Sequence, residues 1–182
     1  VFRSVTGGNS GIGGAMAAAL AVGGAGVVLV ARDAAALAHA AAAIESAGGR
    51  AAWLAADLGE RAAVESCAAA LAAPFGAPDI LVNAAAINLR PPLDQLDLAD
   101  WDRTLRVNLD APFVLGQRLA PAMVGRGWGR IINIASQQAF RAFGNSGAYG
   151  VSKSALVQLT RAQAEAWSKH GVCCNAIAPG FV

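Results

Sequence analysis

Short apolar segments alternate along the chain with longer, alanine-rich ones, and turn residues separate them. The short segments are rich in β-branched and aliphatic residues and have the length of strands, whereas the longer ones have the length of helices. This pattern predicts strands near residues 1–6, 26–31, 50–55, 79–83, 129–135 and 172–178. It predicts helices near residues 11–23, 34–47, 60–73, 100–125 and 148–169.

Strands that alternate with helices form β-α-β units, in which right-handed crossovers join parallel strands and cover both faces of the sheet. We therefore predict an α/β fold with a doubly wound parallel sheet, a Rossmann fold, in the strand order 3-2-1-4-5-6. A chain of 182 residues can bury one core without disulfides or metals, and no linker divides it. We predict a single domain over residues 1–182.

The composition supports this fold and excludes several partners. Hydrophobic residues make up 55% of the chain and charged residues 14%, as buried parallel strands require. The balance of 14 Lys+Arg against 12 Asp+Glu leaves no basic face for nucleic acid. The uncharged span from Ser4 to Ala31 is long enough to cross a membrane, but glycines divide it, so we expect no membrane segment.

The cysteines indicate a reducing compartment. Cys67, Cys173 and Cys174 form neither a disulfide framework nor a zinc-ligand pattern. We predict free thiols, no metal site and a cytoplasmic location.

A glycine-rich loop follows the first predicted strand. Residues 6–13 read Thr-Gly-Gly-Asn-Ser-Gly-Ile-Gly, and Gly7, Gly11 and Gly13 permit a tight turn and a close approach of the backbone. The helix N-terminus that comes next offers free amides and a partial positive charge to a pyrophosphate. The spacing differs from the general G-x-G-x-x-G fingerprint, so an ordinary glycine-rich turn is the alternative.

Three further residues suggest acid–base chemistry. Tyr149 and Lys153 are four residues apart in a predicted helix and therefore share a face. A phenol is a poor acid or base at neutral pH, but a neighbouring ammonium favours its phenolate. Ser136 ends a predicted strand, where strand ends face the crevice of an open sheet. Taken singly, Tyr149 could be an interface aromatic, Lys153 a solvated charge and Ser136 a helix cap.

Together these motifs resemble the short-chain dehydrogenase/reductase family over the whole chain. Residues 6–13 resemble its T-G-x-x-x-G-x-G cofactor loop, and Tyr149 to Lys153 its Y-x-x-x-K. Ser136 resembles its substrate-orienting serine, and Asn108 the asparagine that holds a water in its proton relay.

The resemblance implies a nicotinamide cofactor. Asp57 resembles the family's adenine-binding aspartate, and Pro179-Gly180 its turn beside the nicotinamide. The residues that we expect at the cofactor are Gly7, Asn9, Ser10, Gly11, Ile12, Gly13, Arg32, Asp57, Leu58, Asn83, Ala84, Ala85, Tyr149, Lys153, Pro179 and Gly180. The expected catalytic residues are Asn108, Ser136, Tyr149 and Lys153.

The resemblance also implies a reaction. Tyr149 would donate a proton to a carbonyl oxygen as hydride arrives, or take one in reverse, while Ser136 orients that oxygen. Lys153 would bind the nicotinamide ribose, and Asn108 would connect it through water to solvent. The chain would thus be an oxidoreductase for carbonyl or secondary alcohol groups. A nucleotide-binding regulatory protein without turnover is the alternative from another class.

The end of the second predicted strand favours NADP(H), with NAD(H) possible. A carboxylate there would bind the ribose 2′-hydroxyl of NAD, but that position holds Ala31, and Arg32 suits a 2′-phosphate. If the strand ended one or two residues later, Asp33 would be the ribose ligand and the preference would reverse. Otherwise Asp33 caps the next helix.

The resemblance extends to substrate and assembly. Residues 83–92 and 101–103 are most similar to sugar-acid dehydrogenases of the gluconate 5-dehydrogenase type, with 3-oxoacyl carrier-protein reductases as the alternative. We expect the substrate pocket to include Gln137, Gln138, Phe140 and Arg141. Pairing through the helices near 100–125 and 148–169 would give a homotetramer or homodimer.

The sequence departs from the family at two places. Ala86 stands where the family has a glycine, which could crowd the cofactor. The chain also ends at Val182, before the family's substrate lid and last strand.

Overall fold

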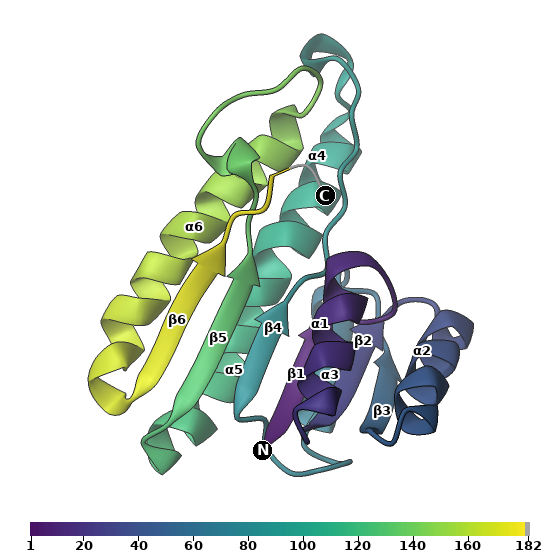
Figure 1. The fold of residues 1–182 in the computed structure, drawn as a ribbon. Helices are drawn as coiled ribbons and strands as arrows, with labels where there is room; N and C mark the ends of the chain where they lie inside the picture. Colours follow the sequence, from purple (N-terminus) through teal and green to yellow (C-terminus); the bar gives the residue numbers. More distant parts are fainter. Residues whose placement is uncertain (181–182) are drawn as a thin grey trace.

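The computed structural model describes residues 1–180 and contains a six-stranded parallel sheet (Figure 1). Its strands are β1 Phe2–Thr6, β2 Gly26–Ala31, β3 Arg50–Ala55, β4 Ile80–Asn83, β5 Gly129–Ile134 and β6 Val172–Ile177. Their order is β3-β2-β1-β4-β5-β6, and every neighbouring pair is parallel. The predicted fold class and strand order are confirmed.

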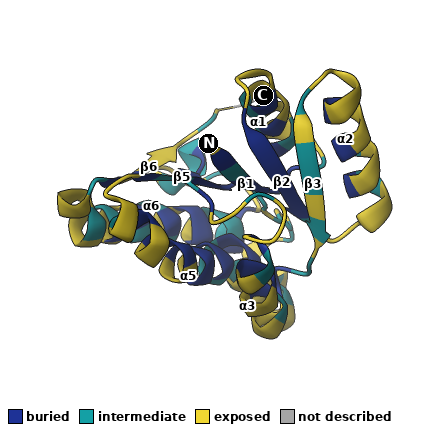
Figure 2. Ribbon diagram, turned by 90° about the horizontal axis from the view of Figure 1, so that it is seen from below, coloured by how far each residue is buried: buried dark blue, intermediate teal, exposed yellow. Residues whose placement is uncertain are grey.

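Helices cover both faces of the sheet (Figure 2). One face carries α1 Gly11–Val22 and α2 Ala34–Ser46. The opposite face carries α3 Arg61–Ala70, α5 Ala111–Arg126 and α6 Gly147–Trp167. This two-sided cover explains why β2 is apolar throughout, without the alternation of apolar and polar residues that a sheet with one exposed face shows.

Strand β2 shows how one apolar run serves two cores. Val27 and Leu29 are buried in the cluster that α1 and α2 cover. Val28 and Val30 are buried in the cluster under α3 and α5. Successive strand residues point to opposite faces, so each core receives every second side chain.

The single helix predicted near 100–125 is in fact interrupted. It consists of α4 Leu98–Leu105, a π-helical turn over Arg106–Asp110, and α5. At this turn the amide of Ala111 donates to the carbonyl of Arg106, five residues earlier. Pro112 explains the position, because it has no amide hydrogen for the carbonyl of Asn108, four residues earlier.

Two short 3-10 helices, Leu93–Gln95 and Gln137–Ala139, were not predicted from the sequence. A third, Ser168–His170, directly follows α6 and overlaps the end of the helix predicted near 148–169. Such single turns are too short to show a hydrophobic period.

Candidate active site

The loop after β1 makes contacts that only glycine permits. Gly7 adopts φ +66°, in the left-handed region, and its amide donates to the carbonyl of Val30 at 2.7 Å. A Cβ on Gly13 would overlap the carbonyl oxygen of Gly7, and a Cβ on Gly7 would lie 3.0 Å from the backbone of Ala85. The loop therefore lies tightly between the first turn of α1 and the end of β4.

The N-terminus of α1 is suited to an anion. Its N-cap, Ser10, has an extended backbone, and its side chain makes no capping hydrogen bond. The first turn contains no acidic residue. The first amides of α1 are therefore left for a ligand, and the helix dipole adds a partial positive charge. This arrangement fits the pyrophosphate of a dinucleotide.

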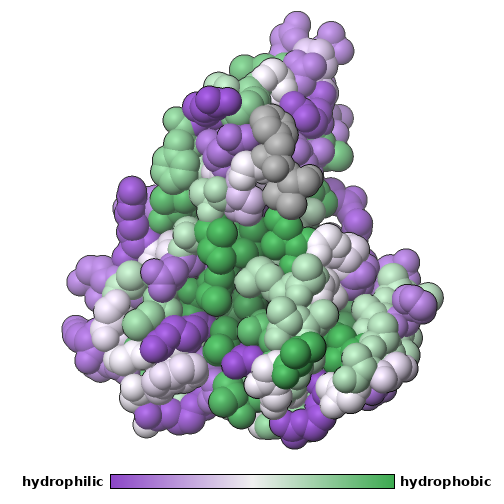
Figure 3. All heavy atoms as spheres, in the orientation of Figure 1, coloured by the Kyte–Doolittle hydropathy of each residue, from purple (hydrophilic) through white to green (hydrophobic). Residues whose placement is uncertain are grey.

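A cleft of about 740 Å³ lies at the carboxyl ends of the strands, beside this loop. In the orientation of Figure 1, hydrophobic residues gather in the middle of the molecular surface, and hydrophilic residues lie at its upper end and along its margins (Figure 3). Sixteen predicted residues line the cleft: Gly7, Asn9, Ser10, Gly11, Ile12, Gly13, Arg32, Asp57, Leu58, Ala84, Ala85, Ser136, Tyr149, Lys153, Pro179 and Gly180. One cleft thus brings together segments from both halves of the chain.

Of the residues expected to bind the cofactor or to be catalytic, Asn83 and Asn108 do not line the cleft. Asn83 is buried, and its Nδ2 donates to Oδ1 of Asn133 on β5 at 2.8 Å. The cleft geometry gives no support to a cofactor contact for Asn83. Its side chain instead joins β4 to β5.

Eight lining residues were not among those expected at the cofactor. They are Ala31, Asp33, Ala56, Ala86, Ile87, Val107, Ile134 and Ala135. Ala31, Asp33 and Ala86 were considered in the sequence but not assigned to the cofactor, and the other five are apolar residues that carry no chemical signal of their own. Ala86, the departure from the family pattern, lies in this lining and is exposed.

Thr6 holds in place the backbone after β4 that forms part of the cleft wall. Its Oγ1 accepts hydrogen bonds from the amides of Ala84 and Ala85, both at 3.1 Å. This side chain is buried and orders the backbone that follows β4. The threonine that opens the glycine motif is thus a structural part of the site.

At one end of the cleft, the structure decides between the two interpretations of residues 30–33. Strand β2 ends at Ala31, and Oδ1 of Asp33 accepts the amide of Ala36 at 3.0 Å as the N-cap of α2. Arg32 is exposed and lines the cleft. The end of β2 therefore presents a guanidinium, while the neighbouring carboxylate is engaged as a cap.

Asp57 lies in the lining with its carboxylate held on two sides. Its Oδ1 accepts the amide of Gly59 at 2.8 Å, and its Oδ2 lies 3.8 Å from Nη2 of Arg103. Both side chains of the ion pair are partly exposed, so the pair adds little stability. The backbone bond is what fixes the carboxylate.

Ser136 both lines the cleft and caps a short helix. Its Oγ accepts the amide of Gln138 at 3.1 Å and so caps the 3-10 helix Gln137–Ala139. Ser136 is therefore a helix cap, which was the alternative role that the sequence suggested for it. It uses a lone pair of the hydroxyl and leaves the hydrogen available for a substrate oxygen.

Lys153 is a buried cation and not a solvated charge, so that alternative is wrong. Its side chain is 2% exposed, and Nζ donates to the carbonyl of Ile134 at 2.6 Å. Nζ lies 5.6 Å from the ring centroid of Tyr149, as the four-residue spacing predicts. Burial lowers the pKa of Lys153 from 10.5 to about 8, because a desolvated ammonium loses its hydration.

Asn108 lies in the π-helical turn, with its side chain bound to protein. Its Oδ1 accepts the amide of Ile87 at 2.9 Å, and its Nδ2 donates to the carbonyl of Ile87 at 2.9 Å and to Oγ of Ser152 at 3.0 Å. Both amide hydrogens are thus in use. A relay water at this residue would need the backbone or the remaining lone pair of Oδ1.

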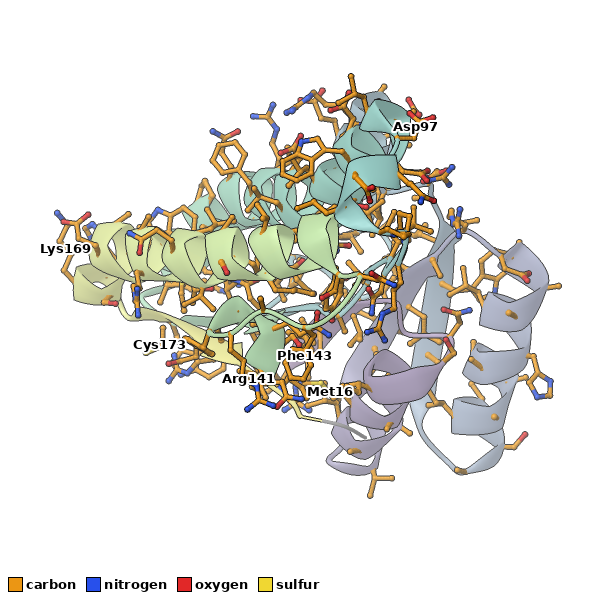
Figure 4. All side chains as sticks on the ribbon, turned by 90° about the horizontal axis from the view of Figure 1, so that it is seen from above. Met16, Asp97, Arg141, Phe143, Lys169 and Cys173 are labelled. Atoms are coloured by element: carbon orange, nitrogen blue, oxygen red, sulfur yellow. The ribbon has the colours of Figure 1, made fainter. Side chains whose placement is uncertain are left out.

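None of the four residues expected in the substrate pocket lines the cleft. Gln137 and Gln138 form the 3-10 helix, and Phe140 is exposed. The guanidinium of Arg141 lies 4.6 Å from the ring centroid of Phe143 (Figure 4). Figure 4 places Arg141 and Phe143 on the side of the sheet that carries Met16 of α1.

Residues 1–180 hold neither a metal-binding cluster nor a membrane-spanning helix. No group of three or more His, Cys, Asp or Glu side chains in this range could hold a metal ion. No helix in the same range is long and apolar enough to cross a membrane.

The fold and this cleft define a nicotinamide-dependent oxidoreductase class, and comparison with known families identifies it. The family of short chain dehydrogenases matches residues 4–182. The chain belongs to the short-chain dehydrogenase/reductase family, whose enzymes act on CH–OH groups.

Named relatives cover nearly the whole chain. Gluconate 5-dehydrogenase from Gluconobacter oxydans is 38% identical over 177 residues, which are 97% of this chain and 69% of the relative. The structure of a gluconate 5-dehydrogenase from Burkholderia cenocepacia, solved with NADP and tartrate, is 37% identical, with a TM-score of 0.92 and coverage of 99% and 71%. A 3-oxoacyl (acyl-carrier-protein) reductase from Agrobacterium tumefaciens, solved with NADP, is 34% identical, with a TM-score of 0.94 and coverage of 99% and 69%.

Proposed function

We propose that this chain transfers a hydride between NADP(H) and a carbonyl or secondary alcohol group of a small polar substrate, with a sugar acid as the preferred class. One observation carries the proposal. Ser136, Tyr149 and Lys153 line the same cleft as the glycine loop and the N-terminus of α1. A dinucleotide bound through its pyrophosphate at that helix would have room to reach these three side chains within one cleft.

The side chains divide the remaining work. The nicotinamide, when bound, supplies or accepts the hydride. The Tyr149 hydroxyl donates a proton to the substrate oxygen in reduction and takes it in oxidation. The free hydrogen of the Ser136 hydroxyl orients that oxygen. The Lys153 ammonium favours the phenolate and offers its remaining hydrogens to the ribose hydroxyls.

Arg32 supports NADP(H) over NAD(H). An exposed guanidinium at the end of β2 can bind a 2′-phosphate through charge-assisted hydrogen bonds. Asp33, the carboxylate that would favour NAD, is engaged as a helix cap. The two structural relatives described above were both solved with NADP.

A sugar acid is our first choice of substrate because gluconate 5-dehydrogenases occur among both the named relatives and the structural relatives. A 3-oxoacyl carrier-protein reductase is the second candidate, supported by the Agrobacterium structure. The two candidates differ in the size and charge of the substrate and in the direction of the reaction.

We also propose a cytoplasmic homo-oligomer. Burial raises the pKa of the Cys67 and Cys174 thiols to about 11, so these free cysteines are unreactive. Free thiols of this kind fit the reducing cytoplasm.

The assembly is supported by exposed apolar residues. Phe113 on α5 and Val151 on α6 are large apolar side chains left exposed on the helices that we expect to pair. Light scattering should give a multiple of the monomer mass, and a monomeric mass would contradict the assembly.

The function is tested by cofactor-linked turnover. We expect NADP reduction with gluconate-type sugar acids, loss of nearly all turnover in Tyr149→Phe, and weaker activity with 3-oxoacyl thioesters and NADPH. Faster reduction of the thioester would favour the second candidate. Absence of turnover with sugar acids, secondary alcohols and 3-oxoacyl thioesters would contradict the proposal.

A further inference from the structure

Ser152 makes two hydrogen bonds beside the cleft although it does not line it. Its side chain is 0% exposed, and it does not line the cleft. Its hydroxyl donates to the carbonyl of Tyr149 at 2.7 Å and accepts Nδ2 of Asn108 at 3.0 Å. One hydroxyl therefore joins the backbone of the tyrosine to the π-helical turn.

Asn108 extends this connection to the loop after β4. Its side chain pairs with both the amide and the carbonyl of Ile87, each at 2.9 Å. Ile87 itself lines the cleft. A continuous path of hydrogen bonds thus runs from Ile87 through Asn108 and Ser152 to Tyr149, and it joins three segments that are distant in the sequence.

The first turn of α6 needs such a connection. Tyr149 is the third residue of the helix, and the N-cap, Ser146, makes no side-chain capping bond. The Ser146 hydroxyl donates instead to the carbonyl of Phe143 at 3.0 Å. Gly150 follows Tyr149 and weakens the turn further. Uncapped helix ends open at low free energy, so the tyrosine lies at the weakest part of its helix.

We propose that Ser152 is a positioning residue for the proposed reaction. It fixes the backbone of Tyr149 to the π-helical turn and thereby holds the phenol in place beside Lys153. The inference rests on the proposed function, because Ser152 acts through Tyr149 and not on a ligand. It also gives Asn108 a role that the sequence did not predict, as the partner that holds Ser152.

Thr104 provides a matched comparison. Its side chain is also 0% exposed, and its Oγ1 donates to a carbonyl of its own helix, that of Asp100, at 2.7 Å. Serine and threonine often make this local bond within helices. Thr104 has the local bond without a connection to Tyr149, so Thr104→Val removes a buried hydroxyl and leaves the path intact.

The test compares Ser152→Ala with Thr104→Val in steady-state kinetics. We expect Ser152→Ala to lower kcat about ten- to a hundredfold, as a displaced reacting group does, with the Kd for NADPH unchanged within about twofold. The pH profile of kcat should also shift, because the phenol moves relative to the ammonium. Thr104→Val should change none of these. Ser152→Cys, which replaces the hydroxyl by a slightly larger and weaker hydrogen-bonding thiol, should be intermediate and serves if Ser152→Ala does not fold.

A double-variant cycle with Asn108→Ala tests the path itself. If Asn108 and Ser152 act as a unit, the double variant should lose no more kcat than the more damaging single variant. Additive losses of kcat, or a Ser152→Ala variant with the kinetics of Thr104→Val, would overturn the positioning role. The proposed function would still stand if the wild type turns over and Tyr149→Phe is inactive. An inactive wild type or an active Tyr149→Phe would overturn both.

Discussion

The two halves of the sheet bury very different side chains. Of the twelve buried polar or charged residues, two lie in residues 1–79 and the other ten in residues 80–180. The two are Ser4 and Thr6. The ten are Asn83, Thr104, Asn108, Asn133, Ser136, Ser146, Ser152, Lys153, Thr160 and Gln163.

The contrast reflects two kinds of site. In the proposed function the first half binds the cofactor with its backbone: glycines allow close approach, and the helix amides are free to bind an anion. The second half holds the side chains that we propose for the chemistry, and each buried polar group there needs a partner to be held. Asn133 illustrates this, since its Nδ2 donates to Thr160 and Gln163 of α6 while its Oδ1 accepts from Asn83. We expect substitutions in the two halves to separate binding from turnover.

The largest effect on cofactor binding should come from Gly13→Ala in the first half. The new Cβ would overlap the backbone oxygen of Gly7, so the loop must shift. We expect NADPH binding to weaken at least about a hundredfold, or roughly 3 kcal/mol, and turnover to be lost with it. Fluorescence titration with NADPH measures this.

Gly14→Ala is the control for that substitution. Its Cβ would lie 3.6 Å from the backbone of Gly8 and of Asn9, at ordinary contact distance. We expect normal NADPH binding and an increase in unfolding free energy of up to about 1 kcal/mol, since alanine is the better helix former. Equal NADPH affinity in Gly13→Ala and Gly14→Ala would show that close packing of the loop is unimportant.

The next effect concerns stability in the second half. Because burial lowers the pKa of Lys153 to about 8, the burial penalty is fully present below pH 8, where folded and unfolded states both bind the proton. Between pH 8 and 10.5 only the unfolded chain binds it, so stability rises. Above 10.5 the penalty is gone. The total change is about 3 kcal/mol.

Urea unfolding of wild type and Lys153→Met across this pH range isolates the effect. The wild-type curve should rise relative to that of Lys153→Met, which has no ammonium to desolvate. Lys169→Met is the control, because Lys169 is exposed at the far end of α6 (Figure 4). A constant difference between wild type and Lys153→Met from pH 7 to 11 would contradict the burial penalty.

A smaller effect should separate the two cofactors. Arg32→Ala combined with Ala31→Asp removes the guanidinium and adds a carboxylate that repels a 2′-phosphate. We expect the ratio of kcat/KM for NADP over NAD to fall about ten- to a hundredfold, equivalent to roughly 1.5–3 kcal/mol. The double variant tests the preference within the binding half. A wild type that already prefers NAD, or an unchanged ratio, would show that Arg32 does not select the cofactor.

Much of the fold and of the cleft lining could be predicted because their signals are local. The apolar run over Val27–Val30 has strand length and both faces buried. The spacing of Tyr149 and Lys153 places them on one helical face. A glycine-rich loop between a strand and a helix can form few structures other than a tight turn at the helix N-terminus.

The connections that hold the site could not be predicted from local signals. Asn83 meets Asn133, which is 50 residues away in the sequence, and Asn108 meets Ser152 across 44 residues. The π-helical turn shifts one set of hydrogen bonds without changing the hydrophobic period, and Pro112 is the signal that could have located it.

NADPH binding and turnover in Tyr149→Phe, measured on the same preparation, test the central claim most directly. The variant removes the oxygen that we propose transfers the proton, and it leaves the glycine loop and the N-terminus of α1 unchanged. We predict an NADPH Kd within about twofold of wild type and a kcat lowered by about 10²- to 10⁴-fold. Turnover close to wild type, or a loss of binding that matches the loss of turnover, would contradict the separation of binding from chemistry.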